Sequence, residues 1–577
     1  MAAMGKDRPA DRHGRRMLAS ITVLASLTVG GASAVGATVD ADVTRALAAG
    51  QQGDRVPVVV VMKRRVNPAR FGVDHARFER ALRQTARASQ GGVARVLSPG
   101  GDVHKLWLVN AVAGRANTIE VARLVERSDV KSVQLDAPVA RIASLATSPL
   151  PDPGSGNWGT TDVQAPRVWE QLGIDGRGIT IGSIDTGADP ANPALAGRIA
   201  NFKDFVSGRA GAYDDNGHGT HTASTMVGVP FEGAEIGIAP GARVIVAKAM
   251  DSSGIGSGSA LLAAAQWMAD PDGNPATADY PAVVNNSWSA PDPNDPWFRS
   301  LLQSWVALGI TPVFASGNNG SVGSPAGYPE VITVGAYDQS HEIPGFSGRS
   351  EFIWKALDGT GPASGTVVRK PDLVAPGVGI MSGYGRGWMT FTGTSMAAPA
   401  VAATAAMMRQ ANPGVTTEEI SRILRATARD IGAPGQELAS GAGALDTLAA
   451  VAMAAGRPVP AGATEVPQSV RSSTSALGSA DAPRSVNTSG ASSSSGLRRV
   501  RVKSGSARTV LSGLATKPTR LRVTLTNSRT GKTAQTRLVD ISGEFSLTFR
   551  PRHGSYRIDV RAPGRAGALQ FSRTITV

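Results

Sequence analysis

Short apolar runs alternate with helical patterns across the middle of the chain. The apolar runs are GITIGSID, ARVIVAKAM, AVVNNSW, TPVFASG and EVITVGA, and the helical segments include SALLAAAQWMA and WFRSLLQSWVALG. Apolar runs without strict alternation are typical of parallel strands that are buried on both faces. The pattern therefore predicts an α/β domain over residues 150–455, with a parallel sheet covered by helices on both sides.

A smaller unit with a different pattern precedes this domain, over residues 55–141. Its segments are the strand PVVVVMK, a helix around FERALRQTARA, the strand HKLWLVNAVAG, a helix around TIEVARLVER and the strand VKSVQLD. The order is strand, helix, strand, helix, strand, with room for one more strand in the middle. This order predicts a ferredoxin-like α+β fold.

The C-terminal part of the chain changes character twice. Residues 456–496 are rich in Ser, Ala, Pro and Thr and hold few large apolar side chains, so we expect a disordered linker. Residues 497–577 return to short alternating strands, among them RLRVTLT, EFSLTF and SYRIDV. This last segment predicts a small all-β sandwich.

The first 37 residues have the pattern of a secretory signal peptide. Several basic residues precede an apolar run of small residues, Met17 to Ala37, which contains the A-x-A sequence Ala32-Ser33-Ala34. The run is just long enough to span a bilayer, so an uncleaved anchor is the alternative. We expect a secreted protein, either extracellular or associated with the cell surface.

Composition narrows the chemistry and places the charge. The 577 residues include no cysteine, which excludes disulfides, thiolate nucleophiles and cysteine-ligated metal sites. Residues 497–577 hold 17 Lys and Arg against 3 Asp and Glu, whereas the other 496 residues are neutral overall. The basic tail predicts an electrostatic module, for which we favour anionic cell-wall polymers over nucleic acid. The alternative is that the charge only maintains solubility.

Ser395 is the candidate nucleophile, in the small-residue segment FTGTSMAAPA. Taken alone, this segment also fits an ordinary helix start capped by hydroxyl groups. A serine nucleophile needs a base, and the base needs an acid that orients it. His218 and His221 lie in the glycine-containing segment DDNGHGTHTASTMVG, and Asp185 ends the predicted strand GITIGSID. Asp185 is thus expected at the carboxyl edge of a parallel sheet, where such sheets build their sites.

Three rival chemistries fit less well. An aspartic protease needs a second carboxylate in a similar motif, and the chain has no second Asp followed by Thr or Ser and then Gly. His218 and His221 lack the Glu of a helical zinc motif. An α/β-hydrolase places its histidine after the serine, and the only later histidine is His553, beyond the linker.

The segments IDTG, HGTHTAS and GTSMAAP resemble, in this order, the three signature segments of the subtilisin-like serine proteases, the subtilases. Between them, GIAPGARV, VVNNSW, FASGNNG and KPDLVAPGV are similar to further family segments. The stretch before VVNNSW and the segment PWFRSLLQSW are most similar to the bacillopeptidase F branch. The resemblance covers about residues 157–448 and implies a subtilisin-like catalytic domain that hydrolyses peptide bonds through an acyl-enzyme.

The resemblance also implies roles for individual residues. Ser395 would be the nucleophile, His218 its base, and Asp185 the residue that orients the imidazole. Asn318 would bind the developing oxyanion together with the backbone N–H of Ser395. His221 is expected to be a packed structural histidine.

Further residues are implied in binding a protein or peptide substrate. The segment Ser287, Trp288 and Ser289 and the loop around Gly256 would form two edges, between which the substrate lies as an extended strand. Ser316 and Gly317 would line the pocket for the residue before the cleaved bond. The preferred residue at that position is not readable from the sequence.

By the same resemblance, residues 55–141 would be an inhibitory prosegment that the enzyme itself removes, with the junction within 142–150. The reaction requires no cofactor, and no metal ligand is assigned. Calcium stays open, although the segment VGVPFEGAEIGIAP does not match the calcium loop of many subtilisins. We expect a monomer. The alternative function is a catalytically silent surface-binding protein on the same scaffold.

Overall fold

A computed structural model describes residues 37–51, 53–72, 74–142, 157–230, 233–290, 293, 297–354, 365–431 and 437–460, together with the backbone of strands within 497–576. The chain divides into two compact units, residues 1–472 and 473–577, each described here by itself. The predicted signal peptide lies outside the described residues except for Ala37. None of the described helices is long and apolar enough to cross a membrane.

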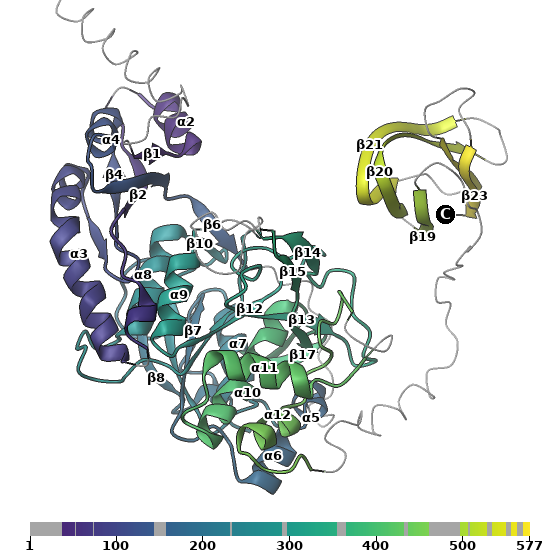
Figure 1. Ribbon diagram of the computed structural model, residues 1–577. Coiled ribbons are helices and arrows are strands. Elements are labelled where there is room, and N and C mark those ends of the chain that lie inside the picture. The colour runs from purple at the N-terminus through teal and green to yellow at the C-terminus, as the bar shows by residue number, and fades with distance from the viewer. Residues whose placement is uncertain are drawn as a thin grey trace, which may run out of the picture. The chain divides into compact units, whose positions relative to one another are not determined.

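A seven-stranded sheet forms the centre of the first unit (Figure 1). Its order is β16-β13-β12-β11-β7-β9-β8, and every neighbouring pair is parallel. The strands are β7 (Thr180–Asp185), β8 (Ile199–Asp204), β9 (Arg243–Lys248), β11 (Val283–Asn286), β12 (Thr311–Ala315), β13 (Ile332–Tyr337) and β16 (Leu373–Pro376). The predicted α/β fold with a parallel sheet is confirmed.

Helices cover both faces of this sheet. On one side pack α6 (Ala165–Leu172), α7 (His218–Val227), α10 (Thr394–Ala411), α11 (Thr417–Thr427) and α12 (Thr447–Ala454), and on the other α8 (Gly258–Ala269) and α9 (Arg299–Ala307). Strand β9 shows why both faces are apolar. Val244 and Val246 join the core under α7 and α10, whereas Ile245 and Ala247 join the core under α8 and α9. Alternate side chains of one strand thus serve two separate cores.

The N-terminal part of this unit holds a second sheet, of order β1-β5-β2-β4-β3. Its elements are β1 (Thr38–Val39), α2 (Ala41–Ala49), β2 (Val56–Met62), α3 (His75–Leu97), β3 (His104–Leu106), β4 (Ala111–Ala116), α4 (Thr118–Val125) and β5 (Val130–Leu135). From β2 to β5 the order is β-α-β-β-α-β, which includes the extra middle strand. Strand β1 and helix α2 precede the predicted boundary at residue 55. Strand β1 pairs with β5 and adds an edge strand to this sheet.

Strand β6 (Pro138–Arg141) follows the N-terminal sheet in the sequence and pairs with a strand of the larger domain. It pairs antiparallel with β10 (Ile255–Ser257), and the backbone N–H of Ile142 donates to the carbonyl of Gly254 at 3.0 Å. Gln266 of α8 also accepts the N–H of Leu108 at 3.1 Å. The N-terminal sheet is therefore bound to the α8 side of the larger domain by backbone pairing and by side chains.

The remaining elements of the first unit are short. They are α5 (Trp158–Asp162), the hairpins β14 (Ser350–Ile353) with β15 (Val367–Lys370) and β17 (Ile380–Tyr384) with β18 (Gly387–Phe391), and the 3₁₀ turns η1 (Pro68–Arg70), η2 (Ser98–Gly100) and η4 (Pro193–Leu195).

The second unit contains a five-stranded antiparallel sheet. Its strands are β19 (Leu497–Gly505), β20 (Arg508–Asn527), β21 (Thr533–Phe549), β22 (Ser555–Arg561) and β23 (Leu569–Thr576). The long strand β20 pairs with β19, β21 and β22, so the strands belong to one hydrogen-bonded sheet. A packed two-sheet sandwich stays a prediction. The linker proposed for 456–496 lies outside the described residues after residue 460.

Candidate active site

The candidate residues gather at the carboxyl edge of the central sheet. Asp185 is the last residue of β7, Ser287 follows β11 directly, and Asn318 follows β12 after two residues. These three strands are neighbours in the sheet. His218 is the first residue of α7 and Ser395 the second residue of α10, and the two helices pack in the same core. The edge is where parallel sheets build their sites.

Asp185 is fully buried and accepts three hydrogen bonds. Its Oδ1 accepts the backbone N–H of Thr186 at 2.7 Å and the Nδ1–H of His218 at 2.8 Å, and its Oδ2 accepts the hydroxyl of Thr222 at 3.2 Å. Because Nδ1 carries the proton, Nε2 is the acceptor nitrogen of the neutral ring. That Nε2 is buried and has no hydrogen-bond partner. The imidazole is thus oriented as a base with its lone pair unused.

Glycines set the spacing between β7 and α7. A Cβ atom on Gly219 would lie 2.1 Å from the carbonyl oxygen of Gly187, and one on Gly187 would lie 2.1 Å from the carbonyl oxygen of Tyr213. Gly187 also has a φ angle of +127°, which residues other than glycine rarely adopt. No larger residue fits at either position, so backbone touches backbone between Asp185 and His218.

Asp214 holds the loop that leads into α7. Its carboxylate accepts the N–H groups of Gly217 at 2.9 Å and Thr220 at 2.8 Å, and the hydroxyl of Thr186 at 2.9 Å. Burial alone would raise the pKa of Asp214, but these hydrogen bonds hold that pKa below its ordinary value. Sequence reasoning missed this residue, although its place in the segment DDNGHG, just before the histidine, is a usable signal.

Ser395 makes its hydrogen bonds with Ser287. The Ser395 hydroxyl donates to the carbonyl of Ser287 at 3.1 Å, and the Ser287 hydroxyl donates to the carbonyl of Ser395 at 2.9 Å. The Ser395 hydroxyl therefore does not bond to Nε2 of His218 in this structure. Catalytic hydrogen bonds are often long or absent before substrate binds, so this geometry is compatible with a base and a nucleophile at rest.

Asn318 is held in a defined orientation by the residue before the serine. Its Oδ1 accepts both the N–H of Thr394 at 2.8 Å and the Thr394 hydroxyl at 3.0 Å. The Thr394 hydroxyl oxygen also accepts the N–H of Gly317 at 3.1 Å. Since Oδ1 is committed to the start of α10, the amide donor Nδ2 lies on the opposite branch of the side chain. Thr394 was not identified from the sequence.

The other predicted binding residues lie near the same edge. Gly256 is in β10, where it pairs with Ala140 of β6. Ser316 is buried and its hydroxyl has no partner, and the ideal Cβ position of Gly317 lies 3.6 Å from the Ser289 hydroxyl oxygen. This places Gly317, at the end of β12, beside Ser289, which follows β11.

Trp288 differs from its neighbours because its ring is packed in the protein core. Its side chain is 4% exposed and makes edge-on contacts with Phe298 and Phe314, with ring centroids 5.4 and 5.3 Å apart. In this structure, which includes residues 74–142, Trp288 therefore contributes to the α9 side of the fold.

His221 has the structural role that the sequence predicts. Its Nε2 lies 3.0 Å from the carbonyl of Ile380 and 3.1 Å from that of Met389, and its ring stacks on Phe391 at a centroid distance of 4.5 Å. Burial, together with the nearby His218, lowers the pKa of His221 to about 3. The ring is thus neutral and serves as a hydrogen-bond donor to hairpin β17–β18.

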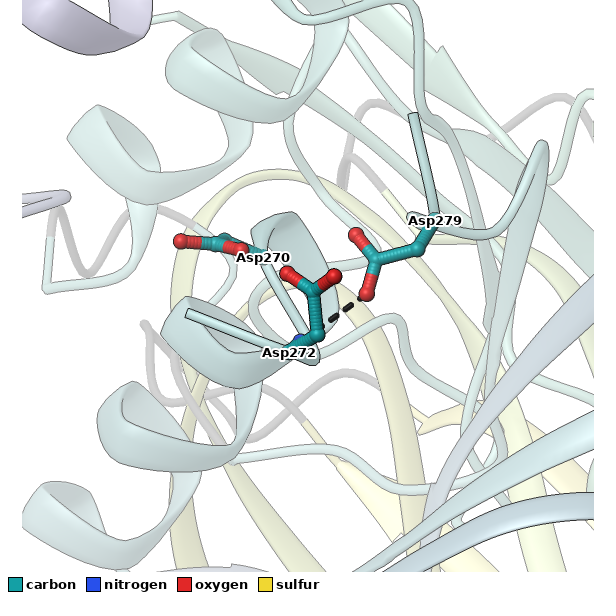
Figure 2. A group of neighbouring side chains, drawn as sticks. All are labelled: Asp270, Asp272 and Asp279. Atoms are coloured by element: carbon teal, nitrogen blue, oxygen red, sulfur yellow. Dashed lines mark hydrogen bonds between the residues drawn. The ribbon is translucent and has the colours of Figure 1, made fainter. Parts of the chain in front are cut away.

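Among the described residues, one group of carboxylates has a geometry that could hold a metal ion. Asp270, Asp272 and Asp279 follow α8, and each offers an oxygen within 4.8 Å of the others (Figure 2). Asp270 is ion-paired with Arg83 of α3, and Asp279 accepts the N–H of Asp272 at 2.9 Å. The Asp272 carboxylate accepts the N–H of Asn274 at 2.7 Å, so each carboxylate has a protein partner, and we assign no metal to the group.

Comparison with known proteins identifies the family. The subtilase family model matches residues 176–443. The chain is 33% identical to subtilisin Savinase of Lederbergia lenta over 278 residues, which are 48% of this chain and 92% of that protein. The chain belongs to the subtilase family. Asp185, His218 and Ser395 of this subtilase all lie within the matched range.

Two further relatives place this subtilase more finely. Over 401 residues, 61% of the chain, it is 33% identical to bacillopeptidase F of Bacillus subtilis, of whose length it spans only 26%. It is 32% identical to an alkaline protease of Alkalihalobacillus alcalophilus over 310 residues, which are 53% of this chain and 72% of that protein. The resemblance to subtilases and to bacillopeptidase F is confirmed, and the chain carries a subtilisin-like serine protease domain.

Proposed function

We propose that this subtilase is a secreted, monomeric serine endopeptidase that hydrolyses peptide bonds in proteins, with Asp185, His218 and Ser395 as its catalytic triad. The observation that carries the proposal is the 2.8 Å pair of Asp185 and His218, whose imidazole keeps its outer nitrogen buried and unpartnered. Ser395 begins a helix that packs against the helix of His218.

In this mechanism, proton transfer runs through one nitrogen. Nε2 of His218 takes the hydroxyl proton of Ser395 as the Ser395 oxygen attacks the carbonyl carbon of the substrate. The same nitrogen then gives the proton to the leaving amine. Asp185 orients the imidazole through Nδ1 and stabilises the imidazolium with its charge, and none of the donors that Asp185 accepts belongs to an arginine or a lysine. Water then hydrolyses the acyl-enzyme by the same steps.

The developing oxyanion needs donors aimed at it. We assign this role to Nδ2 of Asn318 and the backbone N–H of Ser395. The support is that Thr394 accounts for the other amide atom of Asn318, which fixes the side chain beside the start of α10. Ser395 lies in the first turn of that helix, where partial positive charge favours an anion.

We further propose that residues 55–141 act as an inhibitory prosegment that the enzyme removes. Support comes from β6, which is already added as an antiparallel strand to β10, the edge expected to bind substrate. Ile142 continues this pairing onto Gly254 and is buried against it. A substrate strand added at β10 would use the same backbone groups, so the prosegment and a substrate compete.

Fluorophosphonate labelling separates an active enzyme from a catalytically silent binding protein. We expect the purified protein to react at Ser395, as located by mass mapping, and to cleave casein. Ser395→Ala should abolish both the labelling and the cleavage. Ser183→Ala, which alters a buried serine of β7, should retain both activities. An unlabelled wild-type protein with no casein cleavage would favour the silent alternative.

Processing is tested with the same serine variant. Ser395→Ala should accumulate as a precursor that still carries residues 55–141, because the triad that cuts the junction is missing. N-terminal sequencing of wild type and variant measures this directly. A mature N-terminus on the variant expressed alone would assign the cut to another protease.

For the basic tail, residues 497–577, we propose retention at the cell surface by anionic cell-wall polymers. Its net charge of +14 against a neutral remainder supports this. The full chain should sediment with anionic cell walls at low salt and be released as salt rises, whereas a chain that ends at residue 460 should stay in solution. Equal behaviour of both chains would leave the tail as a spacer or solubility domain.

A further inference from the structure

A proline inside α10 removes one hydrogen-bond donor from the turn that carries the nucleophile. Pro399 lies four residues after Ser395, so its backbone nitrogen occupies the place of the donor to the Ser395 carbonyl. Proline has no N–H, and its ring also crowds the carbonyl four residues earlier. A proline in a helix interior is strongly destabilising. The helix therefore needs another donor for Ser395 if this buried carbonyl is to stay satisfied.

Ser287, which directly follows β11 and lies 108 residues away in sequence, supplies that donor. Its hydroxyl donates to the Ser395 carbonyl at 2.9 Å. The hydroxyl oxygen in turn accepts the side-chain N–H of Asn285 at 3.0 Å, so the hydroxyl is fixed from both sides. Ser287 is fully buried and Ser395 is 2% exposed, so water does not readily replace this bond.

The two serines are also joined in the opposite direction. The Ser395 hydroxyl donates to the Ser287 carbonyl at 3.1 Å. One bond holds the backbone of Ser395 and the other holds its side chain. Together they define where the Ser395 oxygen points and where its backbone N–H lies.

We propose that the Ser287 hydroxyl is a positioning group for the nucleophile, which replaces the helical donor that Pro399 removes. The proposal rests on the proposed function of Ser395. It also goes beyond the expected use of Ser287 as a substrate edge, which involves only its backbone. Without the hydroxyl, the turn at Ser395 holds a buried carbonyl with no donor from Ser287 or from residue 399, and the backbone of Ser395 loses one of the two bonds that orient the serine.

A double-mutant cycle tests this relation. Ser287→Ala should lower kcat roughly tenfold, the equivalent of losing one buried hydrogen bond, with KM changed little. The rate of fluorophosphonate labelling should fall by a similar factor. Pro399→Ala restores a backbone N–H to α10, so adding Ser287→Ala to Pro399→Ala should cost much less than it costs alone. Concentrations of active enzyme are fixed by active-site titration.

Two controls keep the test sharp. Ser183→Ala replaces another fully buried serine, in β7, that makes no hydrogen bond to Ser395, and should leave kcat unchanged. Ser287→Thr keeps a hydroxyl and should retain more of kcat than Ser287→Ala. Equal losses from Ser287→Ala in both backgrounds, or a lower melting temperature with unchanged kcat, would overturn the positioning role. A wild-type protein that neither cleaves nor labels would instead overturn the proposed function.

Discussion

In the part of the chain that the structure describes, two buried aspartates of this subtilase each bind a histidine but have different surroundings. At the sheet edge, Asp185 accepts His218 at 2.8 Å. Asp162, at the end of α5, accepts the ring N–H of His341 at 2.9 Å. The second aspartate also binds Arg429 at 2.7 Å and the hydroxyl of Tyr337.

The two carboxylates differ in what else they hold. Burial alone would raise the pKa of Asp162, but hydrogen bonds from His341 and Tyr337 and the charge of Arg429 hold that pKa below its ordinary value. The negative charge of Asp162 is thus compensated by the positive charge of Arg429 within the fold. The hydrogen bonds of Asp185 come from a backbone N–H, a hydroxyl group and His218, and none of them comes from an arginine or a lysine. The pairing of aspartate with histidine therefore does not by itself define a catalytic site, and the two carboxylates differ in that an arginine also binds Asp162.

Removing His218 should break the first pair with the largest effect. We expect His218→Ala to lower kcat by roughly a million-fold, a scale taken from subtilisin, because base and nucleophile act as a unit. The rate of hydrolysis of a peptide substrate per mole of purified protein measures this loss of kcat. His341→Ala is the matched change in the other pair and should retain kcat. Similar losses in both variants would show that the distinction between the pairs is wrong.

Breaking the pair of Asp162 and His341 should lower the stability of the fold and leave the activity unchanged. Asp162→Asn leaves Arg429 buried with no carboxylate at this position, and the free energy of unfolding should fall by about 3–5 kcal/mol. Urea unfolding in a Ser395→Ala background, where self-digestion cannot occur, measures this. Asp338→Asn, in a turn where the carboxylate accepts only backbone N–H groups, should change little. Unchanged stability of Asp162→Asn would contradict the structural role.

Asn318→Ala sharpens the contrast at the sheet edge. Loss of one oxyanion donor typically lowers kcat by roughly a hundred- to a thousand-fold, a scale also taken from subtilisin. KM should change little because the donor acts mainly on the transition state. Steady-state kinetics on a peptide substrate decide the matter. A rise in KM at constant kcat would place Asn318 in substrate binding.

The smallest effect concerns His221, which has no carboxylate partner. Its pKa of about 3 in the folded protein lies below the ordinary value of about 6.5. The unfolded chain therefore binds a proton that the folded chain does not. The stabilising contribution is complete above pH 6.5 and is lost as pH falls toward 3. At pH 5.5 the loss is about 1 kcal/mol.

Unfolding of the Ser395→Ala protein at pH 7.5 and 5.5 measures this loss. Adding His221→Gln should make the difference between the two pH values smaller. An unchanged difference would mean that other groups cause the acid sensitivity.

The sequence predicted where the candidate residues lie on their elements and that Asp185 orients His218, but not their other hydrogen-bond partners. Asp185 ends an apolar run, and His218 and Ser395 precede helical patterns, so their places at strand and helix ends follow from local periodicity. The bond from Ser287 to Ser395 joins residues 108 apart, and that from Arg429 to Asp162 joins residues 267 apart. No spacing rule encodes such bonds, because they depend on how the strands are ordered in the sheet. Only Pro399, four residues after Ser395, hinted that a donor must come from elsewhere.

The contact of Gly187 with Gly219 has a consequence for protein engineering. Because backbone meets backbone there, the separation of β7 from α7 cannot be tuned by side-chain size. A combinatorial library that varies these two glycines would return mostly inactive clones, whichever residues are offered.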